Sequence, residues 1–165
     1  MLNVWLIALG ISSISIQAIA GDPLPPIKVY GPKVCLACID WADHLREHGF
    51  TVSFHGTEDM MAVKRRYKVP ADLESVPTAV VGSYVIEGHV PAEDIKLLLV
   101  EKPKALGLAV PGLPRGAPGR ERFAPSCEQG CTILDNDGAE REVRRELFNT
   151  VLIGPKGKTS VWARH

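Results

Sequence analysis

The stretch GPKVCLACIDWADHLREHGF, Gly31–Phe50, places Cys35 and Cys38 at the point where an apolar strand gives way to a helix. Residues 27–30 indicate the strand, because prolines and a glycine bound a short apolar run. The apolar residues of the helix then recur on one side, at Cys38, Trp41, Ala42 and Leu45. Such a cysteine pair can form a redox couple, clamp a soft metal or fill a core, and the spacing alone leaves all three interpretations open.

The next patterns continue an alternation of strands and helices. Residues 51–55 alternate as a second strand, and Thr57 is the predicted N-cap of a helix. The buried stripe of that helix is predicted from its apolar residues, Met60, Val63 and Tyr67. The β-branched run 76–90 predicts a hairpin, and Pro91 opens a third helix. The order β-α-β-α-β-β-α indicates one α/β domain with its own core.

The last third of the chain departs from this alternation. Residues 103–125 are rich in proline and glycine yet apolar, which predicts an ordered loop wrapped around the domain. The charged run 138–147 has a narrow apolar stripe and predicts a solvated helix. Residues 148–165 predict a hairpin that turns at 155–158 and extends the sheet edge.

Residues 1–20 predict a secretory signal peptide, since they carry no charged side chain and end in the small-x-small pattern Ala18-Ile19-Ala20. An uncleaved anchor is the alternative, but the run is short and polar for a lasting membrane span. The mature chain is therefore expected in the periplasm, where disulfides persist. Lys plus Arg and Asp plus Glu balance at 19 each. The chain therefore has no excess of positive charge of the kind that binds nucleic acid.

A CxxC pair at the start of a helix has a specific chemistry. The first sulfur lies beside unpaired helix N–H groups and the positive end of the helix dipole, which stabilise a thiolate. Cys35 is therefore the predicted nucleophile and Cys38 the resolving partner, with Lys33 adding a favourable charge. The alternative is a static disulfide or two buried thiols.

The segment Ser75-Val76-Pro77-Thr78 agrees with a redox fold. Followed by AVV, it resembles the element that precedes the third strand of thioredoxins and glutaredoxins and faces their cysteine pair. The resemblance implies a cis peptide bond at Pro77 and a substrate-facing loop formed by Val76 and Pro77. The predicted fold class is α/β and thioredoxin-like: a central mixed β-sheet flanked by helices, with a C-terminal β-hairpin extension.

Longer motifs resemble a narrower family. The succession CLAC, WADHLREHGF, VIEGHVPAEDIKLLL, KPKALGLAVPGLPRGAPG and a closing VWARH is similar to the CopG-like family, a metal-binding family of formerly unknown function associated with bacterial copper resistance. The resemblance implies copper, Cu(I) or Cu(II), handled at Cys35 and Cys38, with His89 as a further candidate ligand. The resulting division is a signal peptide at 1–20, a thioredoxin-like CopG-like domain at 21–119, a charged cysteine-containing insertion at 120–147 and a hairpin at 148–165.

The chain departs from that family at two cysteine positions. Members carry a third cysteine in the first motif, where this chain has Ala37, and another before the third strand, where it has Val76-Pro77. Cu(I) accepts two or three soft ligands, so the remaining pair stays a candidate site. The same losses also favour an ordinary thiol-disulfide oxidoreductase.

Other candidate ligands lie outside the first motif. Cys127 and Cys131 fit a soft-metal clamp, a second redox pair or, the interpretation favoured in an exported chain, a structural disulfide. Asp40, His44 and His48 could form a surface metal triad, although solvation of a polar helix face is favoured.

Three functions follow from these patterns. The first is an exported protein that handles copper or another soft metal through its CxxC pair, by binding, by thiol redox chemistry, or by both. The alternative is a general periplasmic thiol-disulfide oxidoreductase, which acts on protein thiols or disulfides and requires no cofactor. The third is a secreted scaffold with structural disulfides only.

Overall fold

The computed structural model describes residues 23–120 and 146–165. The predicted signal peptide, Cys127, Cys131 and nearly all of the predicted charged helix lie outside the described residues.

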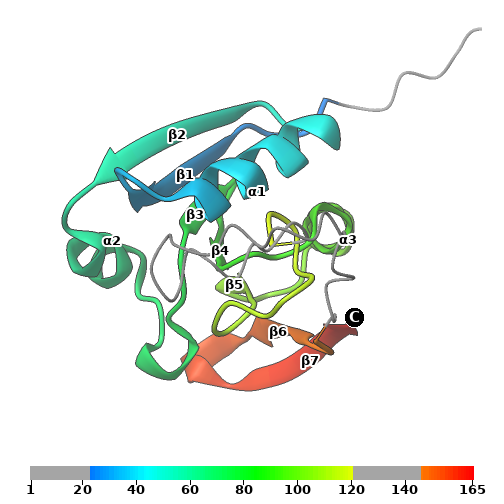
Figure 1. The fold of residues 1–165 in the computed structure, drawn as a ribbon. Coiled ribbons are helices and arrows are strands. Elements are labelled where there is room, and N and C mark those ends of the chain that lie inside the picture. Colours follow the sequence, from blue (N-terminus) through cyan, green and yellow to red (C-terminus); the bar gives the residue numbers. More distant parts are fainter. Residues whose placement is uncertain (1–22, 121–145) are drawn as a thin grey trace, which may run out of the picture.

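A mixed sheet of seven strands runs through the described part of the chain, in the order β2-β1-β3-β4-β5-β6-β7 (Figure 1). The strands are β1 Ile27–Pro32, β2 Val52–Thr57, β3 Thr78–Val81, β4 Tyr84–Glu87, β5 Gly107–Ala109, β6 Asn149–Ile153 and β7 Thr159–Arg164. Strand β1 is parallel to β2, and β4 is parallel to β5, whereas the other neighbours are antiparallel. The predicted α/β class with a mixed sheet is confirmed.

Helices α1 (Leu36–Glu47) and α3 (Ala92–Glu101) cover one face of this sheet. Their apolar residues share one core with β1, β3, β4 and β5, including Val29, Trp41, Leu45, Ile86, Ile95, Leu98 and Leu108. Helix α2 (Met60–Tyr67) lies on the opposite face, where its Lys64 reaches Glu87. Glu87 points away from α1 because it neighbours the core residue Ile86, and successive strand residues face opposite sides.

The first helix follows its predicted pattern. Its buried residues are Cys38, Trp41, Ala42 and Leu45, the four that define the apolar stripe in the sequence. Gly49 follows the helix end with a φ of +90°, the left-handed conformation that glycine adopts at low cost.

The second helix differs from its prediction. Asp59, not Thr57, is the N-cap, because its carboxylate accepts a hydrogen bond from the Ala62 N–H at 2.8 Å. Thr57 instead ends β2, and its hydroxyl accepts from the Asp59 N–H. Met60 is only half-buried, and Lys64 is the buried residue of this helix. The predicted apolar residues Met60, Val63 and Tyr67 are half-buried rather than buried, and a lysine takes the buried position instead.

Strand β5 lies inside the segment that was predicted to be an ordered loop. All three of its residues are buried, and it pairs with both β4 and β6. Gly107 admits the close approach of the Val85 main chain, which a side chain at this position would prevent. A run of three residues is too short to show the alternation from which strands are predicted.

The C-terminal residues form the predicted hairpin and join the sheet through β5. Strands β6 and β7 pair around a short 3-10 turn at Pro155–Gly157. Thr150 of β6 donates a hydrogen bond to the Asp94 carboxylate of α3 at 2.5 Å, and the His165 side chain lies 2.9 Å from the same oxygen. The hairpin is thus fixed to α3 as well as to the sheet.

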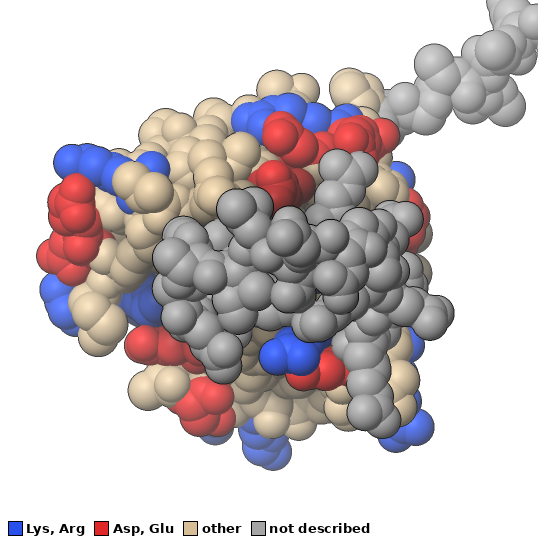
Figure 2. Space-filling model, in the orientation of Figure 1, with Lys and Arg blue, Asp and Glu red and all other residues tan. Residues whose placement is uncertain are grey.

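The surface carries charges of both signs. On the face shown in Figure 2, lysines and arginines alternate with aspartates and glutamates among the described residues, without one broad area of a single sign. In the described ranges, no helix has the length and apolar character needed to cross a membrane.

Candidate functional site: a disulfide at a helix N-terminus

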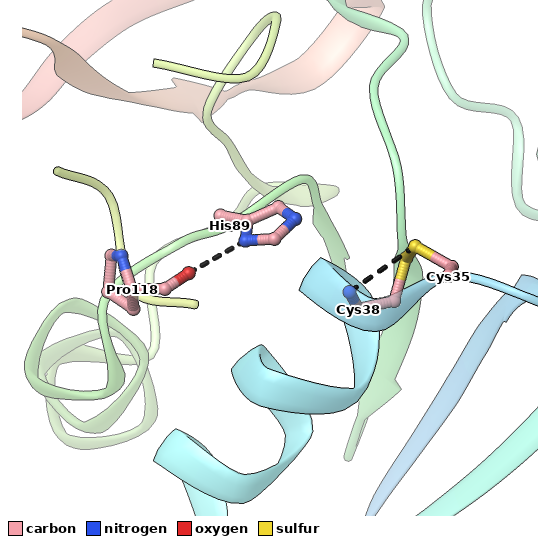
Figure 3. Close-up of a disulfide and its surroundings, with 4 residues drawn as sticks. All are labelled: Cys35, Cys38, His89 and Pro118. Carbon is pink, nitrogen blue, oxygen red and sulfur yellow. Dashed lines mark hydrogen bonds between the residues drawn. A yellow bond between two sulfur atoms is a disulfide. The ribbon is translucent and has the colours of Figure 1, made fainter. Parts of the chain in front are cut away.

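Cys35 and Cys38 are joined by a disulfide at the start of α1 (Figure 3). Cys35 is the N-cap residue, and its sulfur accepts a hydrogen bond from the Cys38 N–H at 3.3 Å. Cys35 is half-buried, whereas Cys38 is fully buried. An attacking thiolate therefore reaches Cys35 first, forms a mixed disulfide with it and releases Cys38. Once that mixed disulfide is reduced, the Cys35 thiolate lies beside helix N–H groups.

The loop that contains Pro77 lies next to the strand that leads to the disulfide. A Cβ on Gly31 of β1 would lie 3.4 Å from the sulfur of Cys38. The antiparallel register of β1 and β3 pairs Tyr30 with Thr78 and, continued by one residue, places Gly31 opposite Pro77. The Val76–Pro77 bond is cis, as the thioredoxin resemblance implied. The substrate-facing role of Val76 and Pro77 stays a prediction.

His89 is fully buried on the loop after β4. Its Nδ1 lies 2.7 Å from the Pro118 carbonyl oxygen, and because a carbonyl only accepts, Nδ1 carries the proton. The lone pair of the neutral ring is then on Nε2. Figure 3 shows the ring between Pro118 and the disulfide, with its other edge directed to the side of the cysteine pair.

The segment that supplies Pro118 packs directly on the first turns of α1. Gly119 has a φ of +78°, and a Cβ there would lie 2.7 Å from the main-chain nitrogen of Trp41 and 2.8 Å from the carbonyl oxygen of Ala37. Trp41 in turn donates its ring N–H to the Val90 carbonyl at 2.8 Å. The loops that hold His89 and Pro118 are therefore both attached to α1. Neither Pro118 nor Gly119 was predicted as part of the site.

Lys64 and Glu87 form a buried ion pair that the sequence analysis missed. Burial raises the pKa of Glu87 above its ordinary value, and hydrogen bonds from Lys64, Ser75 and Thr78 oppose that rise. A signal existed in the sequence: Glu87 interrupts an apolar strand, and Lys64 follows Met60 by one helical turn.

The histidines of α1 do not form the triad considered from the sequence. Nε2 of His44 accepts a hydrogen bond from the Ala92 N–H at the start of α3, at 3.2 Å. Nδ1 of His48 lies 2.7 Å from the His44 carbonyl oxygen, to which it donates. Within residues 23–120 and 146–165, no group of three or more His, Cys, Asp or Glu side chains could hold a metal ion as they stand.

Three exposed apolar residues surround the disulfide. Val34 is 90% exposed, Leu36 70% and Ile39 40%. Val34 precedes Cys35, Leu36 lies between the two cysteines, and Ile39 follows Cys38. A partner that approaches Cys35 would therefore contact apolar surface.

The fold and this site define a mixed α/β protein with a CxxC disulfide at a helix N-terminus. A family described as "Protein of unknown function, DUF411" matches residues 73–120. Two solved structures, both described as copper resistance protein CopG, cover far more of the chain. Form 1 is 35% identical over 86% of this chain and 98% of its own, with a TM-score of 0.68. Form 2 is 36% identical over 87% of this chain and 99% of its own, with a TM-score of 0.69.

The chain belongs to the CopG family of copper resistance proteins. No curated protein sequence matches the chain.

Proposed function

We propose that this chain handles copper and that its reduced Cys35–Cys38 pair binds Cu(I). The relatives are described as copper resistance proteins. The observation that carries the proposal is the position of Cys35, a half-buried residue whose sulfur caps α1 and lies within one turn of Cys38. Two thiolates held this closely form a soft-ligand pair suited to Cu(I).

The oxidation state of the cysteine pair decides whether it can bind Cu(I). In the disulfide neither sulfur is a thiolate, so the pair offers Cu(I) no anionic ligand. A dithiol reductant supplies two electrons, breaks the S–S bond and itself becomes a disulfide, which leaves two thiols on the protein. Binding of one Cu(I) to both sulfurs then releases two protons.

His89 is the proposed third ligand of the reduced pair; in the disulfide form, Cys35, Cys38 and His89 do not stand as a metal-holding group among the described residues. The Pro118 carbonyl fixes the Nδ1–H tautomer, so the nitrogen with the lone pair lies on the opposite edge of the ring. A hydrogen bond from one ring nitrogen to a carbonyl oxygen is how proteins commonly orient metal-binding histidines. Imidazole is an accepted copper ligand beside thiolates.

The fold and the compartment complete the proposal. The order β2-β1-β3-β4, with β1 and β2 parallel and β3 and β4 antiparallel, supports a thioredoxin-like core. The charge-free residues 1–20 support export to the periplasm.

A general thiol-disulfide oxidoreductase is the second candidate function. The observation that favours it is the apolar surface of Val34, Leu36 and Ile39 around the disulfide, on which an unfolded or protein substrate could dock. In this candidate Cys35 attacks a substrate disulfide, and Cys38 resolves the mixed disulfide.

Anaerobic Cu(I) titration of the mature protein tests the proposal. The reduced protein should bind Cu(I), and the same protein with its Cys35–Cys38 disulfide intact should bind it much more weakly. Insulin reduction measured in parallel tests the second candidate. Reduction of insulin without Cu(I) binding would replace the first function by the second, and neither activity would leave a structural disulfide.

A further inference from the structure

A buried hydrogen-bond network centres on Lys64 of α2 and Glu87 of β4. The side chain of Lys64 is 7% exposed and that of Glu87 is fully buried, and the two form an ion pair. The Lys64 ammonium also donates to the Ser75 carbonyl and lies 3.4 Å from the Thr78 hydroxyl. The Glu87 carboxylate accepts the Ser75 N–H and the Thr78 hydroxyl, both at 2.7 Å.

These contacts fix both ends of the Pro77 loop. Ser75 and Thr78 flank Val76 and Pro77, and the network binds the main chain on one side of the loop and a side chain on the other. Strand β3 holds the loop only at its C-terminal end, where Thr78 begins the strand. Lys64 connects the other end, at Ser75, to α2.

The same contacts fix the His89 loop. Glu87 ends β4, and the next residue, Gly88, donates its N–H to the Pro77 carbonyl at 2.8 Å. Gly88 has a φ of +75° and so little space that a Cβ would lie 2.8 Å from the Ser75 hydroxyl. The Pro77 loop and the His89 loop are thus packed as one unit, with the ion pair beneath them.

A buried ion pair does not stabilise a fold efficiently, because desolvation of both charges offsets their attraction. The position of this pair, on the sheet face opposite α1 and below two loops that border the disulfide, indicates another role.

We infer that Lys64 and Glu87 are positioning residues that hold the Pro77 and His89 loops in place against the Cys35–Cys38 pair. The consequence for copper rests on the proposed function: His89 reaches a Cu(I) ion on the cysteines only while the pair is intact. The consequence for the loops does not depend on copper.

The test replaces both charges together, by Lys64→Leu with Glu87→Leu, so that no single charge is left buried. Leucine is chosen because methionine would add a soft ligand. Exchange of the Ser75 and Gly88 amide protons in the metal-free protein should accelerate by roughly tenfold or more, relative to core amides of α1. Cu(I) affinity should fall by roughly tenfold or more. In a His89→Ala background the same double change should cause no further loss of affinity.

The matched control is Lys96→Leu with Glu93→Leu, which removes an exposed ion pair of 3.1 Å on α3 and should leave exchange and affinity unchanged. If the leucine variant does not fold, Lys64→Gln with Glu87→Gln is measured in the same way, since the two amides keep hydrogen-bonding groups and remove both charges. Unchanged exchange overturns the inference. Faster exchange with unchanged Cu(I) affinity supports the holding of the loops and rejects His89 as a copper ligand.

A parent protein that binds no Cu(I) would reject the proposed function without deciding the inference. In that case the rate at which a dithiol reduces the disulfide decides it. A change of roughly threefold or more in the leucine variant, together with faster exchange, supports positioning of the Pro77 loop against the sulfurs. An unchanged rate contradicts it.

Discussion

Cys35 combines two tasks in one side chain: its sulfur caps α1 and forms the accessible half of the disulfide. After reduction, the helix N–H groups that the sulfur faces favour its thiolate, whereas Cys38 is buried in apolar surroundings that do not.

We therefore expect Cys35 to be alkylated first, with an apparent pKa well below the value of about 8.5 for a free cysteine. Rates of iodoacetamide labelling as a function of pH, resolved by peptide mass spectrometry, give both values. Equal and slow labelling of Cys35 and Cys38 would contradict an activated nucleophile.

Gly88 is a position near the site where there is no room for a side chain. A Cβ there would collide with the Val110 carbonyl and the Ser75 hydroxyl, whereas Gly82 also has positive φ but nothing within 4 Å of its Cβ position. Gly82→Ala should cost about 1–2 kcal/mol of unfolding free energy, the ordinary cost of a left-handed residue. Gly88→Ala should cost about 2 kcal/mol more. Chemical denaturation compares the two variants, and equal costs would contradict the close packing of the two loops.

At the scale of elements, a buried hydrogen bond from Thr150 to Asp94 helps to hold the hairpin β6–β7 on α3. Thr150→Val keeps the shape of the side chain but removes the hydroxyl that donates to Asp94, which is 7% exposed. We expect a loss of about 1–3 kcal/mol, because a buried acceptor loses a partner. Thr159→Val on the exposed edge of β7 is the control and should change stability by about 0.5 kcal/mol or less. Similar losses in both variants would show that the buried contact contributes nothing.

The elements that could be predicted are those with a regular apolar period. Helix α1 was predicted with all four of its buried residues, because they recur on one side of the helix over two turns. Strand β5 could not be predicted, since three residues show no alternation. The N-cap of α2 was misplaced because Thr57 and Asp59 are both good caps, and only the course of β2 selects between them.

The candidate site was predictable only in part. The cysteine pair was singled out by its spacing at the start of a helix, and His89 only through the resemblance to the CopG-like family. Lys64 and Glu87 were missed because each is an ordinary surface residue by type, and their contact joins positions 23 residues apart in the sequence. Pro118 takes part through a main-chain carbonyl, which no side-chain pattern reveals.

At the scale of the whole molecule, the site is assembled from separate parts of the chain. The start of α1 supplies the sulfurs, the loop before β3 supplies Pro77, and the loops around His89 and Pro118 close the other side. A substitution in one of these parts should therefore change the surroundings of the sulfurs, because the parts are packed together although they are distant in the sequence.

The second cysteine pair tests whether the site recruits more sulfur than Cys35 and Cys38 supply. If Cys127 and Cys131 replace the ligands missing at Ala37 and Val76, then Cys127→Ser with Cys131→Ser should weaken Cu(I) binding beyond tenfold, about 1.4 kcal/mol. If they form a structural disulfide, the variant should lose thermal stability and keep its affinity. Affinity and melting temperature measured on the same preparation separate the two outcomes, and unchanged affinity in a folded variant rejects the ligand role.

The central claim is that Cu(I) binds at Cys35 and Cys38. Its most direct test is the Cu(I) dissociation constant of the reduced protein, measured anaerobically against a chromophoric competitor, beside that of the variant Cys35→Ser with Cys38→Ser. Serine keeps the N-cap and removes both soft ligands. A loss of roughly a hundredfold or more, about 2.8 kcal/mol, is the predicted result. Equal affinity of the parent and a folded double variant would contradict the claim.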